Sequence, residues 1–257
     1  MSQALDRRLD AALRLGAEAG ALALRMAPPP GSATLKSPQD WLTEADGAVE
    51  RLLSDGLAAL FPEDGFQGEE EGSVRAGRLR WVVDPIDGTS NFARGGSRWA
   101  VSLGLVEDGA ALLGVLAAPA RGETYSARQG SGAWLNGARV RAAATASLSR
   151  SIVEVGWSPR RPDAEFLGLV GRVRAAGAML RAGGSAAVGL AEVAAGRIDA
   201  YVELHVNAWD VAGSLAILAE ADARVSPFLP AGLVDGAPIL AAAPGIADAL
   251  TEAAQLA

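Results

Sequence analysis

The feature that most constrains this chain is a short apolar run that leads directly into two aspartates, in the string WVVDPIDGT. The run Leu79–Val83 is bounded by turn residues and predicts a buried strand that ends at Asp84. Pro85 holds the chain extended, and Gly88 permits a sharp turn after Asp87. Two carboxylates and a backbone carbonyl can then converge on one point, as the hard oxygen ligands of Mg²⁺ do. Taken alone, the same string also fits an ordinary polar turn.

Periodicity along the rest of the chain predicts a mixed architecture, with hairpins early and helix–strand alternation late. This pattern favours a layered α/β or α+β fold in one compact unit, residues 1–257, with lobes of about 1–145 and 146–257. The expected helices are an N-terminal one that ends before Pro28–Gly31, one that opens at Thr43 and closes at Phe61-Pro62, and later ones near 164–176, near 186–195 and from about Ala208. The expected strands are two hairpins, 101–106 with 112–116 and 123–126 with 132–135, and strands near 152–155, 198–204 and 238–242.

Composition excludes several classes of protein. The chain has no cysteine, so it forms no disulfide, thiolate nucleophile or Cys-rich zinc site. A net charge of −7 and a pI near 4.9, without a basic stripe, argue against a nucleic-acid partner. The longest apolar stretch outside the N-terminus, Ala110–Ala118, is too short to span a bilayer. We therefore expect a soluble, cytoplasmic protein that would need a metal ion to shield any phosphate it binds.

Two further acidic strings flank this strand in the sequence, G-E-E-E-G at 68–72 and W-D-V-A-G at 209–213. The first also fits a solvated acidic turn, and Asp210 also fits a helix N-terminal carboxylate. In this order, G-E-E, D-P-I-D-G-T and W-D-x-A-G resemble the signature of the inositol monophosphatase family. The resemblance extends to Lys36–Asp40, Thr43–Asp46 and Arg181–Ala186.

The resemblance implies an αβαβα sandwich and a set of metal ligands. It implies that Glu69, Asp84 and the carbonyl of Ile86 hold one Mg²⁺, that Asp84, Asp87 and Asp210 hold a second, and that a weaker third ion lies beside the glutamate of the G-E-E motif. Clustered carboxylates raise one another's pKa, so such a site needs cations. Only one histidine, His205, is present, which also favours oxygen ligands over a zinc centre.

The resemblance also implies catalytic and substrate-binding residues. Thr89 and Asp46, hydrogen-bonded to each other, would activate the attacking water, with Glu69 also counted as catalytic. A capping-box carboxylate is the alternative role for Asp46. The phosphate would meet Asp87 and the backbone amides of Gly88, Thr89 and Ser90, at the start of a helix.

On the leaving-group side, the family contacts substrate hydroxyls through a turn and a later glutamate, matched here by Gly184, Ser185, Ala186 and Glu203. A helix-entry loop and an exposed strand residue are the corresponding alternatives. Asp210 would position the water that protonates the leaving alkoxide. One departure is Asn207, which stands where animal members usually carry a histidine, and we expect His205 to have a packing role instead.

The function that follows is Mg²⁺-dependent hydrolysis of a small polyol phosphate, with myo-inositol monophosphate the first candidate. Histidinol phosphate or a broader range of sugar phosphates is an alternative within the same fold, which residues 155–163 and 181–185 and Glu203 should decide. A regulatory, protein-binding role in RNA metabolism and a metal-free ligand-binding module are alternatives of another class. The resemblance further predicts a homodimer and inhibition by lithium.

Overall fold

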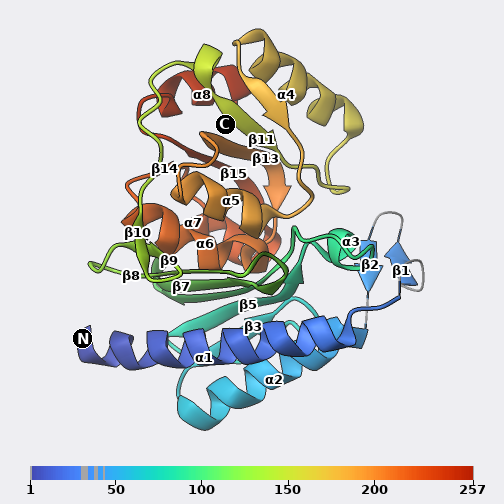
Figure 1. Ribbon diagram of the computed structural model, residues 1–257, viewed down its shortest axis with the longest axis vertical. Coiled ribbons are helices and arrows are strands. Elements are labelled where there is room, and N and C mark those ends of the chain that lie inside the picture. The colour runs from blue at the N-terminus through green and yellow to red at the C-terminus, as the bar shows by residue number, and fades with distance from the viewer. Residues whose placement is uncertain (1, 30–33, 38–39, 43, 257) are drawn as a thin grey trace.

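The computed structural model describes residues 2–29, 34–37, 40–42 and 44–256. Five residues named above lie outside this part of the chain: Pro30, Gly31, Pro38, Gln39 and Thr43. Figure 1 shows five layers, in which helices alternate with two β-sheets. The expected αβαβα sandwich is therefore confirmed.

The first layer consists of two long helices, α1 (Ser2–Met26) and α2 (Glu44–Leu60), which lie side by side on one face of the larger sheet. Helix α1 ends before Pro28, as its sequence predicts. Apolar side chains of both helices pack against Phe66, Trp81 and Leu103 of the sheet. This contact buries Val49, Leu53 and Leu57 of α2, and the charged residues Asp46 and Glu50 are buried with them.

The larger sheet has eight strands, antiparallel except for the neighbours β3 and β5. In spatial order they are β10 (Ala138–Val140), β9 (Ala133–Leu135), β8 (Glu123–Arg128), β7 (Ala110–Ala118), β6 (Ala100–Glu107), β5 (Arg80–Asp87), β3 (Gly65–Gly68) and β4 (Ser73–Arg75). Both predicted hairpins are confirmed. The expected end of a strand at Asp84 is wrong, because β5 continues to Asp87 through a register irregularity against β6 between these two residues.

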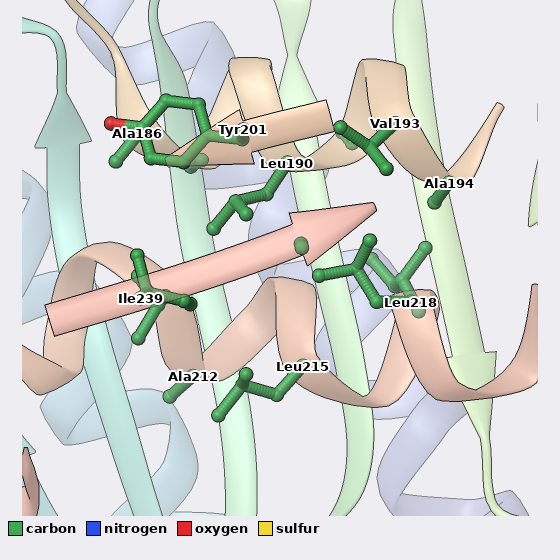
Figure 2. Packing of buried hydrophobic residues seen from close by; sticks show 14 of the residues in the cluster. Ala186, Leu190, Val193, Ala194, Tyr201, Ala212, Leu215, Leu218 and Ile239 are labelled. Carbon is green, nitrogen blue, oxygen red and sulfur yellow. The ribbon is translucent and has the colours of Figure 1, made fainter. Parts of the chain in front are cut away.

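The middle layer holds α5 (Ala186–Ala194) and α6 (Ala208–Glu220), packed between the two sheets. Helix α6 approaches the larger sheet at backbone distance, because a Cβ at Gly114 would overlap the carbonyl of Gly213, and one at Gly104 would overlap Ala212. The largest core cluster of the described residues lies here, and Leu190 of α5, Leu215 of α6 and Ile239 of β15 belong to it (Figure 2).

The smaller sheet has five strands, of which β12, β11 and β13 are parallel and β15 is antiparallel to both neighbours. In spatial order they are β12 (Met179–Arg181), β11 (Ile152–Val155), β13 (Ala200–Val206), β15 (Ala237–Ala242) and β14 (Arg224–Val225). Helices α4 (Asp163–Ala175) and α8 (Ala247–Ala254) cover its outer face. The remaining elements are β1 (Thr34–Ser37), β2 (Asp40–Leu42), α3 (Thr89–Phe92), α7 (Leu229–Asp235) and two 3₁₀ turns, Pro119–Arg121 and Leu148–Arg150.

The predicted boundary between lobes, near residue 145, falls between the last strand of the larger sheet and the first of the smaller one. Helices α5 and α6 contact both sheets. The division of the chain into two separate lobes therefore stays a prediction. Among the helices of the described residues, none combines the length and apolar character needed to cross a bilayer.

Candidate metal and phosphate site

Three aspartates from two elements meet at the carboxyl end of β5. Asp84 and Asp87 lie on β5, and Asp210 lies in the first turn of α6. Carboxylate oxygens of all three lie within 4.8 Å of one another. Asp84 Oδ1 accepts a 2.8 Å hydrogen bond from the amide of Ile86, which stabilises the turn between the two aspartates of β5.

The start of α6 fixes Asp210 through a capping box with Asn207. Asp210 Oδ2 accepts a 2.8 Å hydrogen bond from the Asn207 amide, while the Asn207 side chain caps the amide of Asp210. Asn207 therefore performs a capping role at the position where animal members carry histidine. His205 Nε2 donates a 3.0 Å hydrogen bond to the carbonyl of Asp235, which agrees with the packing role expected for it.

Burial raises the pKa values of all three aspartates. Burial, then Glu69, Asp87 and Asp210, raise the pKa of Asp84 well above its usual value. Burial and the charge of Asp210 raise the pKa of Asp87 to about 7, although hydrogen bonds from α5 oppose the shift. Burial also raises the pKa of Asp210. Adjacent buried carboxylates that resist ionisation form a donor set that fits a hard divalent cation.

The charge of Glu69 contributes to the raised pKa of Asp84, after burial. Glu69 follows β3 in an acidic loop that a buried carboxylate from α2 holds in place. Glu50 Oε2 accepts from the Glu70 amide at 2.9 Å, and Glu50 Oε1 accepts from the Glu71 amide at 2.8 Å. Gly68 lies so close that a Cβ there would overlap the Glu50 carboxylate. Sequence reasoning missed Glu50, although a charged residue on the apolar face of α2 was a visible signal.

Thr89 and Asp46 are the pair predicted to activate the attacking water, and the structure describes the surroundings of each one separately. Thr89 begins α3, and its hydroxyl donates a 2.9 Å hydrogen bond to the carbonyl of Ile86, the oxygen predicted to be a metal ligand. Asp46 is buried in the first turn of α2. The hydrogen bond between Thr89 and Asp46 stays a prediction.

The turn at the start of α3 carries the amides predicted to meet the phosphate. Gly88 has φ +89°, and a Cβ there would meet the carbonyl of Arg98, so only glycine fits. The amides of Asn91 and Phe92 donate to the Gly88 carbonyl, and the earlier amides of a first turn have no intrahelical partner. The amides of Gly88, Thr89 and Ser90, predicted to meet the phosphate, belong to that earlier group.

The predicted substrate turn lies directly against Asp87 of the aspartate cluster. The Ser185 hydroxyl donates to Asp87 Oδ2, and the Ala187 amide donates to the same oxygen at 2.9 Å. The Ala186 amide donates to Asp87 Oδ1 at 3.3 Å. The same Ser185 oxygen caps α5 by accepting from the Val188 amide. Helix α5 thus presents its positive end to Asp87.

Gly184, with φ +70°, is held from the other side by an asparagine that the sequence analysis did not single out. Asn91 Nδ2 lies 3.0 Å from the carbonyl of Gly183, 3.2 Å from that of Gly184 and 2.9 Å from that of Arg98. Asn91 therefore ties the phosphate turn to the substrate turn. Its partners lie up to 93 residues away in sequence, so no local pattern marks it.

Glu203 is buried, at 6% exposed, and not the exposed strand residue that was the alternative. Tyr201, two residues earlier on β13, donates a 2.5 Å hydrogen bond to its Oε2. The predicted leaving-group segment begins beside this pair, because a Cβ at Gly156 would overlap the Glu203 carboxylate. Burial raises the pKa of Asp210, and the charge of Arg160, exposed in the same segment, is among the contributions that oppose this rise.

An ion-pair cluster that sequence reasoning also missed lies behind the Gly183–Gly184 turn. Arg98 contacts Glu154 at 2.8 Å and Glu192 at 2.9 Å, and Arg181 pairs with the same two glutamates. A Cβ at Gly183 would overlap the Arg98 guanidinium. The cluster joins the segment after α3 to β11, β12 and α5, and so fixes the turn between the two sheets.

Comparisons with known proteins agree with this geometry. The model of the inositol monophosphatase family matches residues 4–255. The chain is 42% identical over 234 residues to "Inositol-1-monophosphatase SuhB" of Mycobacterium tuberculosis, covering 85% of this chain and 79% of the relative. It is 38% identical over 191 residues to "Fructose-1,6-bisphosphatase/inositol-1-monophosphatase" of Thermotoga maritima, covering 74% and 72%.

Among solved structures, the extragenic suppressor protein suhB of Bartonella henselae superposes with a TM-score of 0.88 at 30% identity, covering 97% of this chain and 98% of that one. The family is metal-dependent, and the acidic cluster fits that requirement. The chain therefore belongs to the inositol monophosphatase family, whose members are phosphoric monoester hydrolases.

Proposed function

We propose that this chain hydrolyses the phosphate monoester of a small polyol in a Mg²⁺-dependent reaction, with myo-inositol monophosphate as the first candidate. The observation that carries the proposal is the convergence of carboxylate oxygens of Asp84, Asp87 and Asp210 within 4.8 Å of one another. Asp87 directly precedes the turn at Gly88, between β5 and α3. A donor set made only of carboxylate oxygens suits Mg²⁺, whereas softer transition metals favour imidazole and thiolate ligands.

The residues that would hold the ions are those the sequence predicts. Glu69, Asp84 and the Ile86 carbonyl would hold one Mg²⁺, and the three aspartates a second, with a weaker third beside Glu69. When bound, the ions would neutralise phosphate charge and lower the pKa of water at the site. Hydrogen bonds from the first amides of α5 orient the Asp87 carboxylate.

The protein's own groups would then do the rest of the chemistry. Thr89 and Asp46 would orient the attacking water and take its proton, and the amides of Gly88, Thr89 and Ser90 would hold the phosphate. Asp210 would position the water that protonates the leaving oxygen. Gly184, Ser185, Ala186 and Glu203 would contact the polyol, a role that the position of the turn and of Glu203 beside the aspartates supports.

The test is phosphate release from a substrate panel of myo-inositol monophosphate, histidinol phosphate, fructose 1,6-bisphosphate and adenosine bisphosphate. We expect hydrolysis of the inositol ester, loss of activity with chelator and recovery with Mg²⁺. Full activity in chelated buffer would refute the metal, and inactivity toward every ester would refute the function.

A second candidate substrate is a sugar bisphosphate. The cationic Arg160 acts on Asp210 from the segment that begins beside Glu203, and the Thermotoga maritima relative carries fructose-1,6-bisphosphatase in its name. Preference for fructose 1,6-bisphosphate in the panel, lost in Arg160→Ala, would favour this candidate. The predicted homodimer, cytoplasmic location and lithium inhibition are proposed on the family resemblance, with light scattering, cell fractionation and turnover in LiCl at matched ionic strength as their tests.

A further inference from the structure

Tyr201 and Glu203 form a buried pair on the face of β13 that meets α5. Residues two apart on a strand point to the same face, and these two are 2% and 6% exposed. The Tyr201 hydroxyl donates to Glu203 Oε2 at 2.5 Å. A hydrogen bond from a tyrosine hydroxyl to a buried carboxylate restricts the rotamers that the glutamate side chain can adopt.

The surroundings of the tyrosine fix its ring. A Cβ at Gly189 of α5 would lie 2.7 Å from the ring, and a Cβ at Gly156 would overlap its hydroxyl. Figure 2 shows the ring beside Ala186, at the first turn of α5, with the hydroxyl at the edge of the apolar cluster. The absence of a side chain at Gly189 and Gly156 therefore leaves room for the ring and the hydroxyl of Tyr201. From this position the hydroxyl reaches Glu203.

Glu203 also lies near the turn that holds Asp87. Its partner Tyr201 belongs to the same core cluster as Ala186, whose amide donates to Asp87 Oδ1. The charges of Asp210 and Asp87 act on Glu203 as well. Since Tyr201 engages Oε2, the other carboxylate oxygen is the one we expect to meet a substrate hydroxyl. A small rotation of the carboxylate would misdirect that oxygen.

We propose that Tyr201 is a positioning residue, which sets the carboxylate of Glu203 for a polyol hydroxyl and thereby gives the site its selectivity for polyol esters. The proposal rests on the proposed function, because it assigns a role within the same site. Tyr201 touches neither the phosphate nor the metal ligands in this assignment, so its loss affects recognition of the alcohol and not the attack on phosphorus.

The chain supplies a matched control. Its only other tyrosine, Tyr125, is also 2% exposed and donates a 3.0 Å hydrogen bond to a glutamate two residues away on a strand, Glu123 Oε2. That pair lies on β8 among Arg121 and Arg197, and the site described above does not use it. Tyr→Phe at the two positions deletes the same atom from the same kind of pair.

The experiment measures kcat and KM at saturating Mg²⁺ for myo-inositol monophosphate and for p-nitrophenyl phosphate, which has no alcohol hydroxyls on its leaving group. Tyr201→Phe should raise KM for the inositol ester about 10-fold and change kcat/KM for the aryl ester less than about 2-fold. Tyr125→Phe should leave both unchanged. The double variant Tyr201→Phe/Glu203→Gln should have nearly the same KM for the inositol ester as Glu203→Gln alone, because the effects of coupled residues are not additive.

Equal losses on both esters, or no change on either, would overturn the positioning role, as would full additivity of the two substitutions. Thermal unfolding within a few degrees of wild type shows that each variant is folded. If wild type cleaves the inositol ester and Tyr201→Phe matches it, only this inference fails. A wild-type chain that cleaves neither ester overturns the proposed function and this inference with it.

Discussion

Substituting Glu50 by glutamine tests whether metal affinity depends on a residue that contacts no metal in the assignment above. Glu50 is 1% exposed, and its carboxylate accepts from two successive amides of the acidic loop, those of Glu70 and Glu71. Burial raises the pKa of Glu50, and the two amides oppose that shift. Glu50→Gln keeps the shape of the side chain but turns one acceptor into a donor, which then faces an N–H group.

The magnitude follows from one lost hydrogen bond to a charged acceptor. Such a bond contributes about 1.5–3 kcal/mol net, so the observed loop conformation should lose about 2 kcal/mol. Since 1.36 kcal/mol corresponds to a factor of 10, the population of that conformation, and with it the apparent Mg²⁺ affinity through Glu69, should fall by up to about 30-fold. At saturating Mg²⁺, kcat should recover most of its wild-type value.

Two measurements check this expectation: the Mg²⁺ activation midpoint, and calorimetric titration of Mg²⁺ into chelator-stripped protein, which requires no turnover. The control is Asp55→Asn, an exposed carboxylate on the same helix, which should shift neither. A Glu50→Gln variant that folds and keeps the wild-type midpoint and binding constant would refute the reasoning.

Three other outcomes follow from the structure. Asp87→Asn should weaken Mg²⁺ binding and turnover together, whereas Thr89→Ala should leave Mg²⁺ binding nearly intact and lower kcat about 10²-fold or more; normal turnover of Thr89→Ala would exclude its role with water. Gly114→Ala should cost about 1–3 kcal/mol in urea unfolding, because the new methyl group overlaps the Gly213 carbonyl, and an unchanged midpoint would contradict that packing. In metal-free protein the pKa of Asp87 is raised from 3.8 to about 7, so the folded state holds a proton that the unfolded chain releases. Its contribution to the unfolding free energy is therefore full below pH 3.8 and is lost as pH rises to about 7; chelated protein that gains stability over this range would contradict the sign.

The parts of the site that sequence could predict are those encoded locally. Asp84 and Asp87 lie on one strand and its bulge, and Asp210 lies in a helix first turn whose capping box with Asn207 spans four residues. The local sequence around each aspartate is enough to predict its turn or cap. The order of the three acidic motifs along the chain then predicts the family fold. The short strands β3, β4 and β12 were missed because they are three or four residues long and gain their order from neighbours.

The supporting contacts could not be predicted in the same way, because they join distant segments. Arg98 meets Glu154 across 56 positions, and Asn91 meets Gly183 across 92. Tyr201 and Glu50 did leave signals: a tyrosine two residues before a candidate glutamate on a strand, and a carboxylate on an apolar helix face one turn after Asp46. Both signals become specific only when tertiary structure shows what those faces meet.

The charge balance of the two halves of the site favours a bound cation at the aspartates. Arg98, whose guanidinium lies against Gly183, is committed to Glu154 and Glu192, and Arg181 is committed to the same glutamates. These ion pairs balance the charges of the wall that carries the substrate turn. Asp87 receives instead the amides of α5 and the Ser185 hydroxyl, which orient its carboxylate but add only dipoles. Dipoles lower the pKa of Asp87 less than burial and Asp210 raise it, since the net shift is upward. A full positive charge at the three aspartates is thus what this arrangement favours, and a Mg²⁺ ion would supply it while leaving the substrate wall unchanged.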